Sequence, residues 1–171
     1  MSKSTAEPGS QAVANAIVLI RLMVGGVFLV EGILKFLYPN ELGIGRFEKI
    51  GIPAPHLMGP FVGGIEILCG ALVLVGLLTR LAVVPLLIDI SVAIISTKIP
   101  ILLGHGVWRF ANPKAPYHGL LGMVHEGRTD FAMWLGLVFL LAVGSGSWSL
   151  GDLFGRGPAP SKGAPGAGAV K

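Results

Sequence analysis

Four long apolar segments constrain this chain more than any other feature of its sequence. They cover residues 13–38, 58–78, 81–103 and 131–147. A helix needs about 20 apolar residues to cross a hydrocarbon layer about 30 Å thick. Backbone groups in contact with lipid must find their hydrogen bonds within the protein, which helices provide. We therefore expect an all-α integral membrane protein in which four transmembrane helices form one bundle.

The overall composition favours the same class of protein. Of 171 residues, 53% are hydrophobic and only 13% are charged, whereas a soluble domain carries roughly 25% charged residues. The net charge of +4 is scattered along the chain, without the clustered basic residues that bind nucleic acid, so we expect no nucleic-acid partner. The single cysteine, Cys69, excludes an internal disulfide and a CxxC redox pair.

The remaining segments divide the chain. Residues 1–12 form a polar N-terminal segment, residues 13–154 the membrane domain, and residues 155–171 a Gly/Pro/Ala-rich tail that we expect to be disordered. Four spans put both termini and the short Thr79-Arg80 turn on one face, opposite the connections 40–57 and 104–130. Five lysines and arginines lie on each face, so the positive-inside rule gives no orientation.

Ionisable residues inside the expected helices are the candidate site, because each costs about 2.5–3.5 kcal/mol at the membrane centre. Helical spacing places Arg21, Glu31 and Lys35 on one side of the first helix. Equal depth, counted from the connecting loop, places Glu66 of the second helix beside Glu31. We predict a loop-side cluster of Glu31, Lys35 and Glu66, and a second pair formed by Arg21 and Asp89.

Two interpretations of these charges remain open. The acids and bases can line a cavity and share protons, or they can simply pair to fix how the helices pack. Lys98 falls on the opposite side of its helix from Asp89, which indicates an interface anchor. We expect the start of the last helix at Phe131 to be capped by Thr129 and Asp130, and the glycines inside the spans to allow close helix packing.

Metal and haem sites are not expected in the bundle. All four histidines fall in connections, and their spacing is not that of metal ligands or of a bis-histidine haem site. These residues are His56, His105, His118 and His125. Cys69 is interpreted as a buried structural thiol, with a reactive thiol as the alternative.

Several motifs together resemble the DoxX family of small bacterial and archaeal membrane proteins. They are RLMVGGVFLVEGILKFLYP, GIPAP, GGIEILCGALVLVGLLTRLA and RTDFAMWLGLVFLLAVGSGSWSLGDLF, which cover most of residues 21–154. The resemblance implies a four-span bundle in the cytoplasmic membrane with cytoplasmic termini. It also implies importance for Arg21, Lys35, Glu66 and Arg80, and an association with thiosulfate:quinone oxidoreductase or oxidative-stress complexes.

Three functions follow as hypotheses. The first is a subunit of a quinone-linked oxidoreductase, in which the polar cluster holds a quinone or a small sulfur-containing anion. The second is a proton or small-solute pathway, although the chain shows no inverted repeat. The third is a non-catalytic anchor for soluble or membrane redox partners. Membrane lipids are expected partners in each case, a quinone is the candidate cofactor, and oligomerisation and catalysis by the chain itself remain open.

Overall fold

The computed structural model describes residues 8–146 and 149, and all its regular elements in that part of the chain are helices. The all-α prediction is confirmed. The tail 155–171, the first seven residues and the end of the segment 131–147 lie outside the described residues. The elements are α1 (Pro8–Leu37), α2 (Ile44–Ile50), α3 (Pro55–Val75), α4 (Thr79–Ala93), the π-helix η1 (Ile94–Lys98), α5 (Ile99–Leu103) and α6 (Gly119–Val143).

Three helical stretches are long and apolar enough to cross a membrane. They are Asn15–Leu37, Pro55–Val75 and Thr79–Leu103, the last of which runs through α4, η1 and α5 without a break. These three agree with the first three expected spans to within a few residues. The helix α1 begins at Pro8 and so includes the last residues of the polar segment 1–12.

The last helix differs from its prediction. A start at Phe131 was expected, but α6 begins at Gly119 and continues for 25 residues. Thr129 and Asp130 therefore lie inside the helix and do not cap it. The helix begins 12 residues earlier, directly after an extended His118 and at Gly119, whose φ is +80°. The charged residues Glu126, Arg128 and Asp130 consequently belong to the first half of α6.

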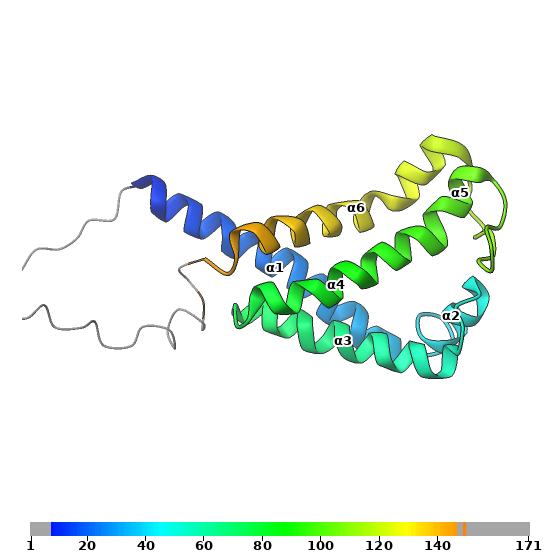
Figure 1. The fold of residues 1–171 in the computed structure, drawn as a ribbon, viewed down its shortest axis with the longest axis horizontal. Helices are drawn as coiled ribbons and strands as arrows, with labels where there is room; N and C mark the ends of the chain where they lie inside the picture. The colour runs from blue at the N-terminus through cyan, green and yellow to red at the C-terminus, as the bar shows by residue number, and fades with distance from the viewer. Residues whose placement is uncertain (1–7, 147–148, 150–171) are drawn as a thin grey trace, which may run out of the picture.

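The long helices run side by side and alternate in direction (Figure 1). The start of α1, the turn between α3 and α4, and the end of α6 lie at one end of the bundle, which we call the terminal end. The connections 38–54 and 104–118 lie at the other end, which we call the loop end. From their short turn, α3 and α4 diverge towards the loop end, where α2 lies (Figure 1).

Glycines bring α1 and α3 into backbone contact. A Cβ atom on Gly25 would lie 2.8 Å from the carbonyl oxygen of Gly70, and one on Gly32 would lie 2.7 Å from that of Gly63. Small residues at such crossings let membrane helices approach closely. The predicted packing role is thus confirmed at these positions. Gly26 has no atom within 4 Å of such a Cβ, so it serves no close contact.

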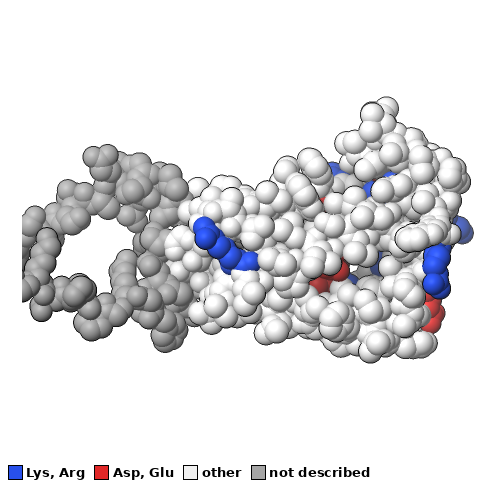
Figure 2. Space-filling view, in the orientation of Figure 1, with Lys and Arg blue, Asp and Glu red and all other residues white. Residues whose placement is uncertain are grey.

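Apolar side chains fill the terminal half of the bundle and also cover its outside. The fully buried ones include Val24, Val73, Leu86, Leu137 and Leu140. Many large apolar residues on the outside of the spans are exposed, which suits contact with lipid tails. In Figure 2 the charged atoms gather towards the loop end, at one place near the terminal end, and in a hollow between α3 and α4.

Candidate functional site

A cavity of about 630 Å³ lies in the loop-end half of the bundle, where α3 and α4 diverge. Its wall is built from α1, α2, α3, α4, η1 and α6 and is mainly apolar, with Phe28, Phe61, Ile65, Ile88 and Met133 among the lining residues. Figure 2 shows acidic atoms inside the hollow between α3 and α4. This size and mixed lining are typical of small-molecule pockets, which measure about 300–1,000 Å³.

A buried ion pair lies on the wall of this cavity. The Nζ atom of Lys35 is 2.6 Å from Oε2 of Glu66, and both side chains are at least 88% buried. Lys35 and Glu31 lie four residues apart on α1, so they project from the same face. Glu66 projects from α3, and both Glu31 and Glu66 line the cavity. The loop-side residues thus surround one space.

Asp89 joins these residues from the third helix. It lies on α4 and lines the same cavity as Lys35 and Glu66. A charged side chain buried in an apolar surrounding is costly unless it is paired. We call this lysine and these two carboxyl groups, which line one cavity from three helices, the acid–base cluster (Lys35, Glu66 and Asp89).

Arg21 lies elsewhere, and the expected pair with Asp89 was wrong. Its guanidinium donates hydrogen bonds to the carbonyl oxygens of Val73 (3.0 Å), Leu74 (2.7 Å) and Ser145 (3.1 Å). It therefore lies at the terminal end, whereas Asp89 lies ten residues into the helix that starts at Thr79, or about 15 Å deeper. The depth estimate failed because α1 extends beyond its neighbours at the terminal end.

The prediction that Lys98 lies on the opposite side of its helix from Asp89, which assumed regular helical spacing, was also wrong. Its Nζ atom lies 3.0 Å from Oδ2 of Asp130 on α6, and it lines the same cavity as Asp89. Nine residues are two and a half turns of a regular α-helix, which would put the two side chains on opposite faces. The π-helix Ile94–Lys98 has wider turns and rotates Lys98 towards the cavity.

Two residues of the sequence indicate why the π-helix forms where it does. Pro100 has no N–H group for the carbonyl of Ser96, and the hydroxyl of Thr97 donates to the carbonyl oxygen of Ala93 at 2.6 Å. Both effects weaken regular α-helical hydrogen bonding at this point. Pro100 and Thr97 are the signal in the sequence from which the π-helix could have been expected. Because it was missed, the pair Lys98–Asp130 was missed as well.

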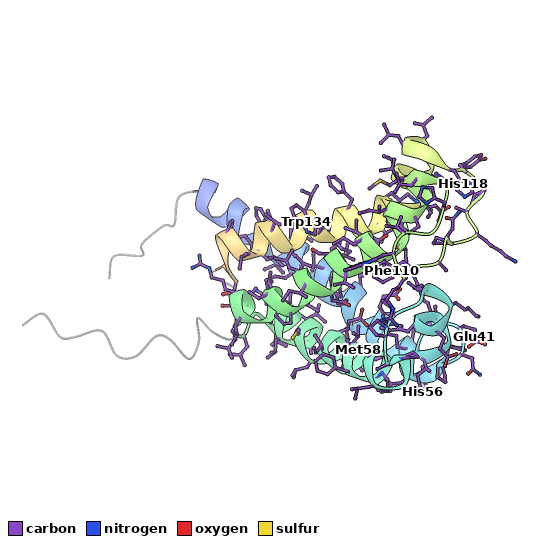
Figure 3. The ribbon with its side chains drawn as sticks, turned by 45° about the vertical axis from the view of Figure 1, so that its right-hand side comes forward. Glu41, His56, Met58, Phe110, His118 and Trp134 are labelled. Atoms are coloured by element: carbon purple, nitrogen blue, oxygen red, sulfur yellow. The ribbon has the colours of Figure 1, made fainter. Side chains whose placement is uncertain are left out.

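The remaining predicted residues lie away from the cavity. Arg80 donates a hydrogen bond of 3.0 Å to the carbonyl oxygen of Ala142 and is exposed at the terminal end. Cys69 is a free, buried thiol in the apolar core. His118 and His56 lie at the loop end (Figure 3). His125 lies in α6, not in a connection as expected. Among the described residues, no three His, Cys, Asp or Glu side chains are grouped as metal ligands would be.

Comparison with known proteins identifies the family. The family model DoxX matches residues 16–99. The chain is also 53% identical over 135 residues to the uncharacterized membrane protein Rv3486 of Mycobacterium tuberculosis, across 79% of this chain and 78% of the relative. The chain belongs to the DoxX family. This DoxX chain is thus a multi-pass membrane protein, and no solved structure matches it.

The part matched by the DoxX model contains most of the cavity's charged residues. Residues 16–99 include the whole acid–base cluster, Glu31 and Lys98. Asp130, the partner of Lys98, lies on α6 outside the matched part. In this DoxX chain, α6 therefore contributes Asp130 to a cavity whose other ionisable residues lie in the part matched by the family model.

Proposed function

We propose that this chain is a membrane subunit of a quinone-linked redox system and that its cavity binds the quinone headgroup. One observation carries the proposal: a mainly apolar cavity of about 630 Å³ has the Lys35–Glu66 ion pair and Asp89 on its wall. A quinone is an apolar ring with two carbonyl oxygens. It needs an apolar slot, a hydrogen-bond donor and a source of protons, and this cavity contains candidates for each.

In the proposal, Lys35 supplies the hydrogen-bond donor, and Glu66 and Asp89 supply the protons. The ammonium of Lys35 is a charged donor for a carbonyl oxygen of the ring. The carboxyl groups of Glu66 and Asp89 both line the cavity, and a protonated carboxyl group can donate a hydrogen bond. A proton held by either group would lie next to the space where the ring would bind. Reduction of a quinone to a quinol takes up two electrons and two protons, with the electrons supplied by a redox partner protein.

The shape of the bundle favours a binding site over a pathway through it. The hollow lies between α3 and α4 on the side of the bundle (Figure 2), where a lipid-soluble molecule enters from the bilayer. On the terminal side of the acid–base cluster, fully buried side chains such as Leu86 and Leu137 fill the interior. Transport would need an opening there, and a passive anchor would need no charged cavity.

We also infer that α6 is the fourth span, in the cytoplasmic membrane with both termini in the cytoplasm. The 25 residues of α6 measure about 37 Å, which exceeds the hydrocarbon thickness of about 30 Å. Asp130, whose charge would oppose insertion, is paired with Lys98. The orientation and the choice of membrane follow the resemblance described above.

A quinone-binding measurement on the purified chain tests the proposal. Quenching of Trp134 fluorescence by an added short-chain quinone should give saturable binding, because Trp134 is next in the chain to Met133, which lines the cavity. We expect Lys35→Met and Glu66→Gln to weaken this binding about tenfold or more, since a hydrogen bond to a charged group contributes about 1.5–3 kcal/mol. Glu41→Gln, on the exposed connection before α2, is the matched control.

Two results would contradict the proposal. One is equal quinone affinity in the wild-type chain and the Lys35→Met and Glu66→Gln variants, with all of them folded by circular dichroism. The other is an equal loss of affinity in Glu41→Gln, which would show that any lost carboxylate weakens binding. In either case the acid–base cluster is a structural pairing of the helices.

A further inference from the structure

A second, smaller pocket at the loop end is strongly basic. It has a volume of about 280 Å³, and four of its lining residues are lysines or arginines. Arg46 and Lys49 come from α2, Lys98 ends η1, and Lys114 belongs to the connection before α6. One carboxylate, Glu126 of α6, also lines it. Three separate segments therefore direct positive charge to one small space.

Most of this positive charge has no acidic partner in the part of the chain that the structure describes. Lys98 is paired with Asp130, at 3.0 Å. Within the described residues, Arg46, Lys49 and Lys114 take part in no ion pair. Like charges held near one another repel, and an anion between them removes that cost. The pocket therefore has the charge and the shape of an anion site.

The surroundings of the pocket favour an anion that is joined to an apolar body. The pocket shares Arg46, Ile50, Thr97 and Lys98 with the mainly apolar cavity, so it lies at the edge of that cavity. It also lies at the loop end, where the connection 104–118 contains Trp108, which is 97% exposed. Aromatic side chains of this kind gather at the level of lipid headgroups.

We propose that this basic pocket binds the phosphate group of an anionic phospholipid. Basic pockets between membrane helices bind the anionic headgroups of lipids, because their lysines and arginines attract the negative phosphate. A free phosphate ion offers the same chemistry without the apolar chains, and the pocket's position at the membrane edge favours the lipid. The site is separate from the acid–base cluster and does not depend on quinone binding.

Native mass spectrometry of the full chain in detergent tests this site. The chain is titrated with phosphatidylglycerol, with phosphatidylcholine as the zwitterionic comparison, and separately with inorganic phosphate, all without quinone. We expect phosphatidylglycerol to bind more tightly than phosphatidylcholine. Lys49→Gln and Lys114→Gln should each weaken phosphatidylglycerol binding about fivefold, and the double variant more. Arg109→Gln removes one charge at the same end, outside the pocket, and should leave binding unchanged.

Each outcome supports or overturns the proposal. If inorganic phosphate alone binds, and Lys49→Gln and Lys114→Gln weaken it, the phosphate site stands and its source is the free ion. If phosphatidylglycerol binding persists in excess inorganic phosphate, the source is the lipid. Equal binding of the two lipids together with no phosphate binding overturns the proposal, as does an equal loss in Arg109→Gln. Glu66→Gln should not affect lipid binding, which separates this result from the quinone test.

Discussion

Arg21 shows how one charged residue can stabilise a membrane bundle without facing a carboxylate at the cavity. It is only 3% exposed, and two of its hydrogen bonds go to the carbonyls of Val73 and Leu74 at the end of α3. The last carbonyls of a helix have no partner within the helix, and in hydrocarbon they find no water. A positive charge at this end also suits the helix dipole. Arg21 therefore closes α3 and connects it to Ser145 after α6.

The variant Arg21→Lys should unfold more easily than the wild type. A lysine cannot hold three separated carbonyls with the forked geometry of a guanidinium. We expect the free energy of unfolding to fall by about 1.5–3 kcal/mol, measured as a lower Tm in detergent. Arg80→Lys loses one exposed hydrogen bond, to Ala142, and should change stability by less than about 1 kcal/mol. Equal shifts in both variants would contradict this role.

Counting along the sequence found some site residues and misplaced others. Glu31 and Glu66 were expected close together because they lie at nearly equal distances from one connection, and Lys35 because it lies about one turn from Glu31; regular α-helices preserve such distances. Arg21 was misplaced because the overhang of α1 depends on where its neighbours end. Lys98 was misplaced because a π-helix changes the rotation of every residue after it.

Close backbone approach between α1 and α3 sets the position of the cavity's inner wall. The crossings at Gly25–Gly70 and Gly32–Gly63 leave no room for a side chain. Because α1 carries Lys35 and α3 carries Glu66, this contact also holds their 2.6 Å ion pair in register. Packing of these two elements and geometry of the acid–base cluster are therefore coupled.

Alanine substitutions at neighbouring glycines should have opposite effects. Gly25→Ala would place a Cβ 2.8 Å from the carbonyl oxygen of Gly70, and overpacking of this kind costs about 1–3 kcal/mol. Gly26→Ala meets nothing within 4 Å and should be neutral or up to about 1 kcal/mol stabilising, because alanine favours the helix. Thermal unfolding of both variants in the same detergent decides this. A lower Tm for Gly26→Ala than for Gly25→Ala would contradict it.

The sequence predicted the first three spans well but not the start of α6. The three spans Asn15–Leu37, Pro55–Val75 and Thr79–Leu103 were recognised because long apolar runs have few other stable conformations in a membrane. The start of α6 was missed because Thr129 and Asp130 were interpreted as a cap at its beginning, whereas they lie inside it. Lys98 pairs with Asp130 from another helix, and a single segment carries no sign of such a partner.

At the scale of the whole molecule, α6 returns the chain to the end where α1 begins (Figure 1). If α6 spans the membrane, the two termini share a compartment. If only Asn15–Leu37, Pro55–Val75 and Thr79–Leu103 do so, the termini lie in opposite compartments. The two arrangements therefore differ in a property that can be measured in intact cells.

Single cysteines introduced at Ser2, Ser161 and Trp108, in a Cys69→Ser background, should separate these arrangements. Four spans predict that an impermeant maleimide labels Trp108→Cys from outside, and that the two terminal cysteines react only after the cells are opened. Labelling of Ser161→Cys alongside Trp108→Cys in intact cells would instead indicate three spans. Cys69 itself is buried, so its replacement by serine removes the background without exposing a new group.

The packed terminal half of the bundle makes its two ends different in their access to the cavity. Leu86, Leu137 and Leu140 are fully buried on the terminal side of the cavity, so packed side chains separate the acid–base cluster from the terminal end. A quinone reduced in the cavity would then take its protons only from the compartment at the loop end. Turnover would then acidify or alkalinise one aqueous phase, and the direction of that change would be fixed by how the chain was inserted.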